Sequence, residues 1–174
     1  MVTKLEAAKR QLETAIRMIF SGGDPVATHT LVGAASNILS DLIQHQFPDR
    51  SWDTQAQSAN SLAPSDYFTI MRKAQNFLKH AKADPDGSFG LEFSDTDSLT
   101  FWAVMNLSEL ESPLPMPESV FQMWYLACYS PCIDDGSSIN GTIRELFGDL
   151  RQRDRNERIS VGARILAEHE NNDV

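Results

Sequence analysis

The spacing of apolar residues near the N-terminus is the feature that most constrains the fold. Between Thr3 and Phe20 apolar side chains recur with the period of an α-helix and form one stripe, made up of Leu5, Ala8, Leu12, Ile16, Ile19 and Phe20. Thr3 suits the N-cap of this helix, and the two glycines in the SGGDP segment that follows favour its end. Asp24 followed by Pro25 is typical of an N-cap and a first helical residue. The pattern therefore predicts helices over about residues 3–20 and 25–46.

The same period continues along most of the chain. It predicts further helices over about residues 65–83, 97–110, 117–130 and from 142 into the 160s. Residues 47–64 lack a clear period, and we expect a long connection there with no more than one helical turn. With 174 residues, of which 41% are hydrophobic, the chain can bury one sizeable core. We therefore predict an all-α fold, a bundle of about five to six helices that forms a single domain over residues 1–174.

Two details of these helices concern what they contact. Residues 117–130 are apolar nearly all round, so this helix is either central to the core or shared with another subunit, and we expect a homodimer formed through it. His29 falls on the polar side of the second predicted helix, where a lone histidine is more often structural than a ligand.

The net charge of −9 is distributed unevenly along the chain. Residues 83–143 contain no lysine or arginine and ten acids, which are Asp84, Asp86, Glu92, Asp95, Asp97, Glu109, Glu111, Glu118, Asp134 and Asp135. This middle third would repel a nucleic acid, because phosphate backbones are bound through lysine and arginine contacts, but it could attract a basic partner. Six arginines follow it, interspersed with acids, and predict a solvated helix with ion pairs: Arg144, Arg151, Arg153, Arg155, Arg158 and Arg164.

Few residues have the spacing of a metal or redox site. The two cysteines, Cys128 and Cys132, are too few for a disulfide framework or a zinc site, and we expect two reduced thiols. Residues 84–95 resemble part of an EF-hand calcium loop, but Phe89 and Asp95 stand where that loop has glycine and glutamate, so a turn explains them better. We expect no cofactor and no metal. Two i, i+4 pairs could each hold a single ion: His80 with Asp84, and Asp41 with His45.

No apolar run approaches the length of about 18 residues that a membrane span requires. The N-terminal segment carries Lys4, Lys9 and Arg10 among periodic apolar positions, in place of the charged tip and apolar block of a secretory signal. We therefore expect a cytoplasmic protein that makes no contact with a membrane.

The predicted helix over residues 65–83 carries the residues on which a functional hypothesis can be based. At about 100° per residue its apolar side chains fall on one side: Tyr67, Ile70, Met71, Ala74, Phe77, Leu78 and Ala81. Arg72, Asn76 and His80 project together from the other side, along about 12 Å of the helix axis. Arginine can hold a phosphate through two parallel hydrogen bonds, and histidine can exchange a proton with a sugar hydroxyl. RNA cleavage without a metal needs both roles, and two antiparallel copies would bring Arg72 of one chain near His80 of the other.

An all-helical bundle with Arg, a polar residue and His in a row on one helix resembles the HEPN superfamily, many of whose members are dimeric ribonucleases or partners of nucleotidyltransferases. The resemblance implies that Arg72 is a phosphate clamp, that Asn76 is an orienting group and that His80 donates or accepts a proton. Seven residues separate Arg72 from His80, which is more than in the family's motif. Lys73 stands at the family's spacing from His80, with lysine in place of arginine.

Two hypotheses about function follow. The first is a HEPN-like module that acts on RNA or pairs with a nucleotide-handling partner, with Arg72, Asn76 and His80 as its catalytic residues. The second is a non-catalytic, dimeric interaction protein whose acidic middle third forms the partner-binding surface.

Overall fold

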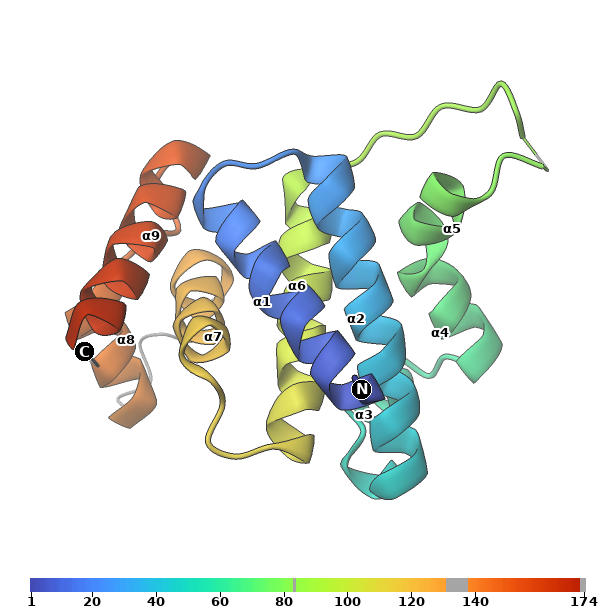
Figure 1. Cartoon of the computed structure of the whole chain (residues 1–174), viewed down its shortest axis with the longest axis horizontal. Helices are drawn as coiled ribbons and strands as arrows, with labels where there is room; N and C mark the ends of the chain where they lie inside the picture. The colour runs from blue at the N-terminus through green and yellow to red at the C-terminus, as the bar shows by residue number, and fades with distance from the viewer. Residues whose placement is uncertain (83, 131–137, 173–174) are drawn as a thin grey trace.

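The computed structural model of the chain describes residues 1–82, 84–130 and 138–172, and this part of the chain is built from helices without strands (Figure 1). The elements in chain order are α1 (Lys4–Phe20), α2 (Pro25–Gln46), the 3₁₀ helix η1 (Pro48–Arg50), α3 (Trp52–Ala59), α4 (Pro64–Met71), α5 (Lys73–Lys79), α6 (Phe93–Leu110), α7 (Met116–Tyr129), α8 (Ser138–Phe147) and α9 (Arg155–Asn172). The predicted all-α class is confirmed. The predicted number of five to six helices is too low, because the described residues form nine α-helices.

The first two helices begin where their capping residues predict. The Thr3 hydroxyl accepts a hydrogen bond from the Glu6 N–H at 3.1 Å, and the Glu6 carboxylate accepts one from the Thr3 N–H at 2.8 Å. The Asp24 carboxylate accepts a hydrogen bond from the Ala27 N–H at 2.8 Å, and Pro25 is the first residue of α2. These side chains satisfy N–H groups that have no partner within their own helix.

The main hydrophobic core is formed by α1, α2, α6 and α7, and α8 and α9 add buried side chains to it (Figure 1). Val120, Phe121 and Trp124 of α7 are fully buried, which supports the first of the two alternatives for this helix, a position at the centre of the core. The Trp124 indole N–H donates to the Arg158 carbonyl at 2.8 Å, which ties α7 to α9. Because these apolar side chains are covered within one chain, they no longer support a homodimer formed through α7.

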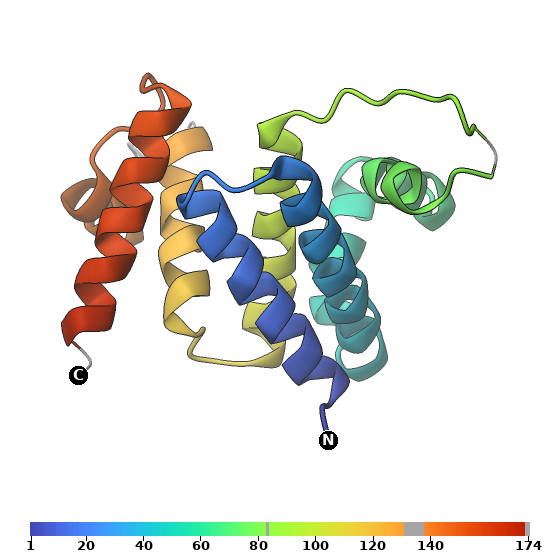
Figure 2. The ribbon, with the colours of Figure 1, turned by 45° about the horizontal axis from the view of Figure 1, so that its top comes forward.

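Two groups of helices flank this core on opposite sides, as both ribbon views show (Figures 1 and 2). α8 and α9 pack against α7, whereas α5 packs against the outer side of α2 and α3 against α6. The connection over residues 47–64 is more regular than predicted, because it contains η1 and the whole of α3. Of the helices described, none combines the length and the apolar composition that a membrane span requires.

The single helix predicted over residues 65–83 is wrong, because it is divided at Arg72 into α4 and α5. The Arg72 backbone, with φ −97° and ψ 3°, leaves the helical region and serves as the C-cap of α4 and the N-cap of α5. The break allows α5 to approach α2 closely at Gly33, where an added Cβ would lie 2.7 Å from the Gln75 side chain. A straight helical projection therefore assigns the faces incorrectly: Ile70 is 62% exposed, and Gln75 is buried.

Two further helix boundaries differ from the prediction. The last predicted helix is divided into α8 and α9, with Gly148 at φ +68° after α8 and the Asp154 carboxylate accepting the Glu157 N–H at 2.9 Å at the start of α9. α6 begins at Phe93, earlier than the predicted start at about residue 97, so Thr96 and Asp97 are buried residues inside the helix. Glu92 and Asp95 cap it.

Candidate functional site

The three residues predicted to act together are divided between two parts of the surface. Asn76 and His80 are exposed at α5, where the His80 N–H donates to the Asn76 carbonyl at 3.1 Å. Arg72 is half-buried at the junction of α4 and α5, with its guanidinium carbon 4.4 Å from the centre of the Phe68 ring. It borders a small recess that also includes Asp53. The structure brings together Asn76 and His80 but not Arg72.

Asn76 and His80 line an open hollow of about 770 Å³, which we call the outer hollow. Its other lining residues are Lys73, Phe77, Asp84, Ser88 and Phe89. Lys73 is thus the cation that shares a cavity with Asn76 and His80, and it has the residue spacing from His80 that the HEPN motif has for its arginine. The structure therefore places Lys73, and not Arg72, beside Asn76 and His80.

The outer hollow lies in a locally basic part of an acidic protein. Between Asp66 and Asp84 the sequence contains Arg72, Lys73, Lys79 and Lys82 and no acidic residue. The three lysines are exposed. Of these cations Lys73 lines the hollow and would attract an anionic ligand, whereas the Asp84 side chain of the same lining would oppose it.

Aromatic side chains form one wall of the outer hollow. The Phe77 and Phe89 rings stack with their centres 5.4 Å apart, and the Lys73 Nζ lies 5.8 Å from the centre of the Phe89 ring. Phe89 comes from the segment between α5 and α6, so this contact links that segment to α5. A cation beside flat aromatic rings can contact both the phosphates and the bases of a single strand.

Lys73 and Phe89 also border a second cavity of about 280 Å³, which we call the inner pocket. Its remaining lining residues come from α2, α4, α5 and α6, and they are His29, Ile70, Met71, Ala74, Asp95, Ser98, Leu99 and Trp102. Because two residues are common to both cavities, the inner pocket and the outer hollow are neighbours.

His29 is the residue of the inner pocket that sequence reasoning placed wrongly. It is 2% exposed, whereas the sequence predicted it on a polar face. The reason is that α2 packs against α1, α5 and α6, so more than one of its faces is buried. Val32 and Ile43, which fall on the same side of α2 as His29 and are fully buried, could have indicated this.

One ring nitrogen of His29 is satisfied and the other is not. Nδ1 lies 3.0 Å from the Thr96 hydroxyl, whereas Nε2 is buried without a hydrogen-bond partner. Burial lowers the pKa of His29 despite the nearby Asp95 carboxylate, so the ring is neutral at pH 7. A buried polar atom without a partner costs about 1–3 kcal/mol, and among the described residues Gln11, Gln75, Glu118 and Arg155 each have such an atom as well.

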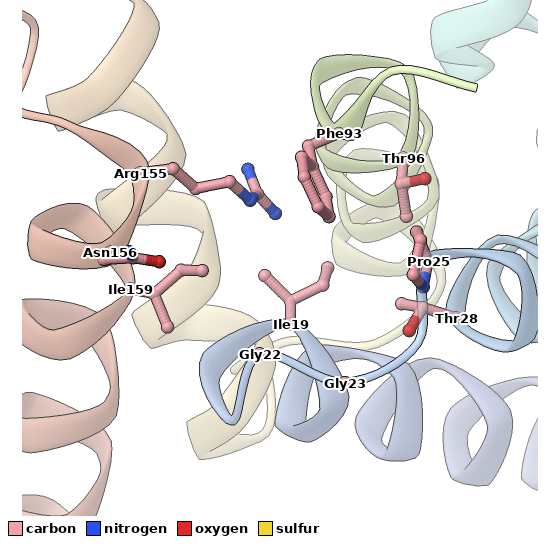
Figure 3. Close-up of a pocket in the computed structure, with 10 residues that line it drawn as sticks. All are labelled: Ile19, Gly22, Gly23, Pro25, Thr28, Phe93, Thr96, Arg155, Asn156 and Ile159. Atoms are coloured by element: carbon pink, nitrogen blue, oxygen red, sulfur yellow. The ribbon is translucent and has the colours of Figure 1, made fainter. Parts of the chain in front are cut away.

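A different recess of about 210 Å³ lies between α1, α6 and α9 (Figure 3). Arg155 points into it toward Phe93, and Ile19 and Ile159 supply apolar walls (Figure 3). The Arg155 guanidinium is already bound by Asp97, with Nη1 and Nη2 at 2.6 and 3.1 Å from its carboxylate oxygens. This arginine therefore stabilises the fold. The solvated ion pairs predicted for the C-terminal arginines are formed by Arg151, Arg153 and Arg164 with neighbouring acids.

Several acids of residues 83–143 are engaged within the fold. Glu109 accepts from Arg50 at 2.6 Å, and Glu111 accepts from Lys9 at 2.6 Å. Asp97 is fully buried, and Glu118 is 1% exposed with its pKa raised to about 7 by burial. Asp134 and Asp135 lie outside the described residues. The predicted acidic surface is therefore interrupted by internal pairing.

The other candidate ligands are dispersed. Cys128 is buried, and burial raises its pKa to about 12, so its thiol is protonated at neutral pH; Cys132 lies outside the described residues. Residues 84–95 begin with a turn in which the Gly87 N–H donates to the Asp84 carbonyl at 2.9 Å. The Asp95 carboxylate accepts the Glu92 N–H at 3.1 Å. Within the described ranges no three His, Cys, Asp or Glu residues group as a metal site would require.

Comparisons with protein-family models, with curated proteins and with solved structures found no significant match to this chain.

Proposed function

We propose that this protein is a HEPN-like helical module that binds single-stranded RNA in the outer hollow. The observation that supports this most directly is that Lys73, Asn76 and His80 line one cavity. Lys73 is one of the four cations that lie between Asp66 and Asp84, where the sequence has no acid. The Phe77–Phe89 stack adds the aromatic surface that single-strand binding uses.

Each of the three polar residues has a role in this proposal. The Lys73 ammonium contacts a phosphate, and the Asn76 amide orients the sugar or the same phosphate through hydrogen bonds. In a cleavage step the His80 imidazole would take a proton from a ribose 2′-hydroxyl, and the 2′-oxygen would attack the adjacent phosphorus. The bond from phosphorus to the 5′-oxygen of the next nucleotide would then break, leaving a 2′,3′-cyclic phosphate and a 5′-hydroxyl that takes its proton from water. In this arrangement Lys73 takes the phosphate role that the sequence had suggested for Arg72.

Binding is tested by fluorescence anisotropy with a labelled single-stranded RNA of about 12 nucleotides, within the range of strand lengths that such sites cover. Lys73→Glu is compared with Lys4→Glu, since both residues are exposed lysines at the first position of a helix and both changes alter the net charge equally. We expect Lys73→Glu to weaken binding at least tenfold and Lys4→Glu by less than twofold. Equal effects of the two changes would show that any binding is a non-specific response to charge.

Cleavage is tested separately from binding. If His80 transfers the proton, His80→Ala abolishes cleavage of the RNA and leaves its affinity within about threefold, because in this proposal Lys73 supplies the phosphate contact. His45→Ala is the matched control, since His45 is also an exposed histidine near a helix end. Intact RNA after prolonged incubation with the wild type would limit the proposal to binding.

The homodimer and the nucleotide-handling partner predicted from the sequence remain predictions. An antiparallel pair of chains could still bring Arg72 near His80 of a second copy, and sedimentation with and without RNA would detect it. The acidic partner-binding surface has less support, because Glu109 and Glu111 are paired within the chain and Glu118 is buried.

A further inference from the structure

We propose that the inner pocket receives a single nucleobase, turned inward from the RNA strand that lies in the outer hollow. This inference rests on the proposed function, because the strand would deliver the base. It adds a second site to that function, in which His29 identifies the base by a hydrogen bond and Trp102 and Phe89 supply flat surfaces.

The size and walls of the inner pocket suit a flat ring. Its volume of about 280 Å³ is just below the range of about 300–1,000 Å³ that is typical of small-molecule pockets, which favours a single base over a whole nucleotide. Most of its lining is apolar, from Ile70, Met71 and Leu99 to the indole of Trp102. Bases stack on such surfaces in single-strand complexes irrespective of their identity.

The polar groups of the inner pocket suit the edge of a base. His29 is 2% exposed, its Nε2 has no partner, and its ring is held in place by the Thr96 hydroxyl at 3.0 Å from Nδ1. Asp95 and Ser98 also line the cavity, and each already has a partner in the chain, the Glu92 N–H for the Asp95 carboxylate and the Tyr125 hydroxyl for Ser98. A neutral imidazole can donate or accept at Nε2, and a carboxylate can accept a second N–H group, so a base that carries both donors and acceptors suits this set of residues.

The two shared lining residues explain how one strand could use both cavities. Lys73 and Phe89 border the inner pocket on one side and the outer hollow on the other. A phosphate held by Lys73 would leave the adjacent base close to the Phe89 ring. Unstacked bases of single strands are commonly splayed out and read on their hydrogen-bonding edges in this way.

The first experiment measures binding of free nucleosides, which lack phosphate, to the full-length protein by calorimetry and by the ¹⁵N chemical shift of His29 Nε2. We expect saturable binding with a Kd in the millimolar range or below, and a shift of Nε2 on saturation. His29→Leu keeps an apolar side chain of similar size and should weaken binding at least tenfold, whereas His29→Gln retains a hydrogen-bonding group and should retain part of it. Lys4→Glu is the control, with unchanged affinity. Circular dichroism establishes that each variant is folded.

The second experiment uses RNA strands that carry one abasic position, moved stepwise along the sequence. We expect one position at which loss of the base weakens binding to the wild type at least tenfold, and no such position for His29→Leu. Nucleosides that bind His29→Leu as tightly as the wild type, or strands that bind equally well at every abasic position, would overturn the base pocket while leaving the proposed RNA binding in place. Nucleoside binding without strand binding would instead overturn the proposed function and support the pocket.

Discussion

Two regions of the molecule each contain a cation that lies beside an aromatic ring and a cavity. The two regions differ in whether a carboxylate binds that cation. At the junction of α6, α7 and α9, Arg155 lies 4.2 Å from the centre of the Phe93 ring and binds the fully buried Asp97. At α5, Lys73 lies 5.8 Å from the centre of the Phe89 ring, and no carboxylate of the described residues forms an ion pair with it. The first cation completes the fold, and the second remains available to a ligand.

The same difference extends to the polar groups around each cation. Asp97 also accepts the Tyr129 hydroxyl at 2.7 Å, so the buried carboxylate has both charge and hydrogen-bond partners. In the α5 region, by contrast, Asn76 and His80 face an open cavity. Each region also contains a buried nitrogen without a hydrogen-bond partner, which is Arg155 Nε in the first and His29 Nε2 in the second, so such an atom does not by itself distinguish the two regions. The comparison therefore rests on the carboxylate that Arg155 binds and that Lys73 lacks among the described residues.

The largest expected effect is in the first region. Asp97→Ala leaves the half-buried Arg155 without its counter-ion and the Tyr129 hydroxyl without its acceptor, so we expect the free energy of unfolding to fall by about 3–5 kcal/mol in urea titrations. Glu168→Ala, which removes an exposed ion pair with Arg164, is the control and should cost no more than about 1 kcal/mol. A loss below 1 kcal/mol for Asp97→Ala would break the comparison, because Arg155 would then be as available as Lys73.

The second prediction concerns Glu118, a buried carboxyl in the same half of the molecule, which forms no ion pair among the described residues. Glu118 is 1% exposed, and burial raises its pKa to about 7. A raised pKa means that the folded state holds a proton which the unfolded state releases near pH 4.5, so this contribution to stability is present below pH 4.5 and is lost as the pH rises through about 7.

Glu118→Gln removes this dependence, since the amide stays neutral. We expect the variant to be more stable than the wild type at pH 8 by about 3 kcal/mol and equally stable at pH 4, as measured by urea titrations across this range. Glu6→Gln is an informative control, because the hydrogen bonds from Thr3 lower the pKa of Glu6 and so reverse the sign of its pH dependence. Parallel pH profiles for Glu118→Gln and the wild type would contradict the prediction.

The third prediction tests a satisfied network that lies next to Arg72. Asp53, which is 7% exposed, accepts hydrogen bonds from Ser40, Tyr67 and Asn106 at 2.7, 2.8 and 2.9 Å. Tyr67→Phe removes one bond to a charged acceptor and should cost about 2 kcal/mol of unfolding free energy.

Tyr125→Phe is the matched control for that change. It removes a hydrogen bond to the neutral Ser98 hydroxyl at 3.1 Å and should cost about 1 kcal/mol or less. If Tyr67→Phe cost no more than Tyr125→Phe, the Asp53 network would not anchor α4 as its geometry indicates.

Local signals predicted the helix starts well, and tertiary packing explains the failures. Thr3 and Asp24 cap their helices as expected, because a cap depends on residues within one turn. The break at Arg72 has no proline or glycine to mark it, and it accompanies the close approach of Gln75 to Gly33 on a distant helix. The bond between Asp97 and Arg155 spans 58 residues, so no local pattern could indicate it.

The candidate site was only partly predictable for the same reason. Asn76 and His80 lie four residues apart on a short helix, and a local projection placed them on one exposed face correctly. Arg72 was grouped with them on the assumption of a straight helix, and the structure places Lys73 there instead. His29 depends on the packing of three other helices around α2, which a single hydrophobic stripe does not reveal.

The smallest expected effect on stability is at Lys73. Lys73→Ala removes an exposed side chain that has no ion pair among the described residues, so the free energy of unfolding should change by no more than about 0.5 kcal/mol. Its effect on RNA binding should be much larger than that: the slope of log K against log salt should become shallower by about 0.7, because one phosphate contact is lost. Both quantities are measured on the same protein preparation, by urea titration and by anisotropy at several salt concentrations. A large loss of stability would mean that Lys73 holds the fold as Arg155 does, whereas an unchanged salt slope would mean that it contacts no phosphate. The combination of a stable protein and a shallower slope is what distinguishes a cation kept for a ligand from one used by the fold.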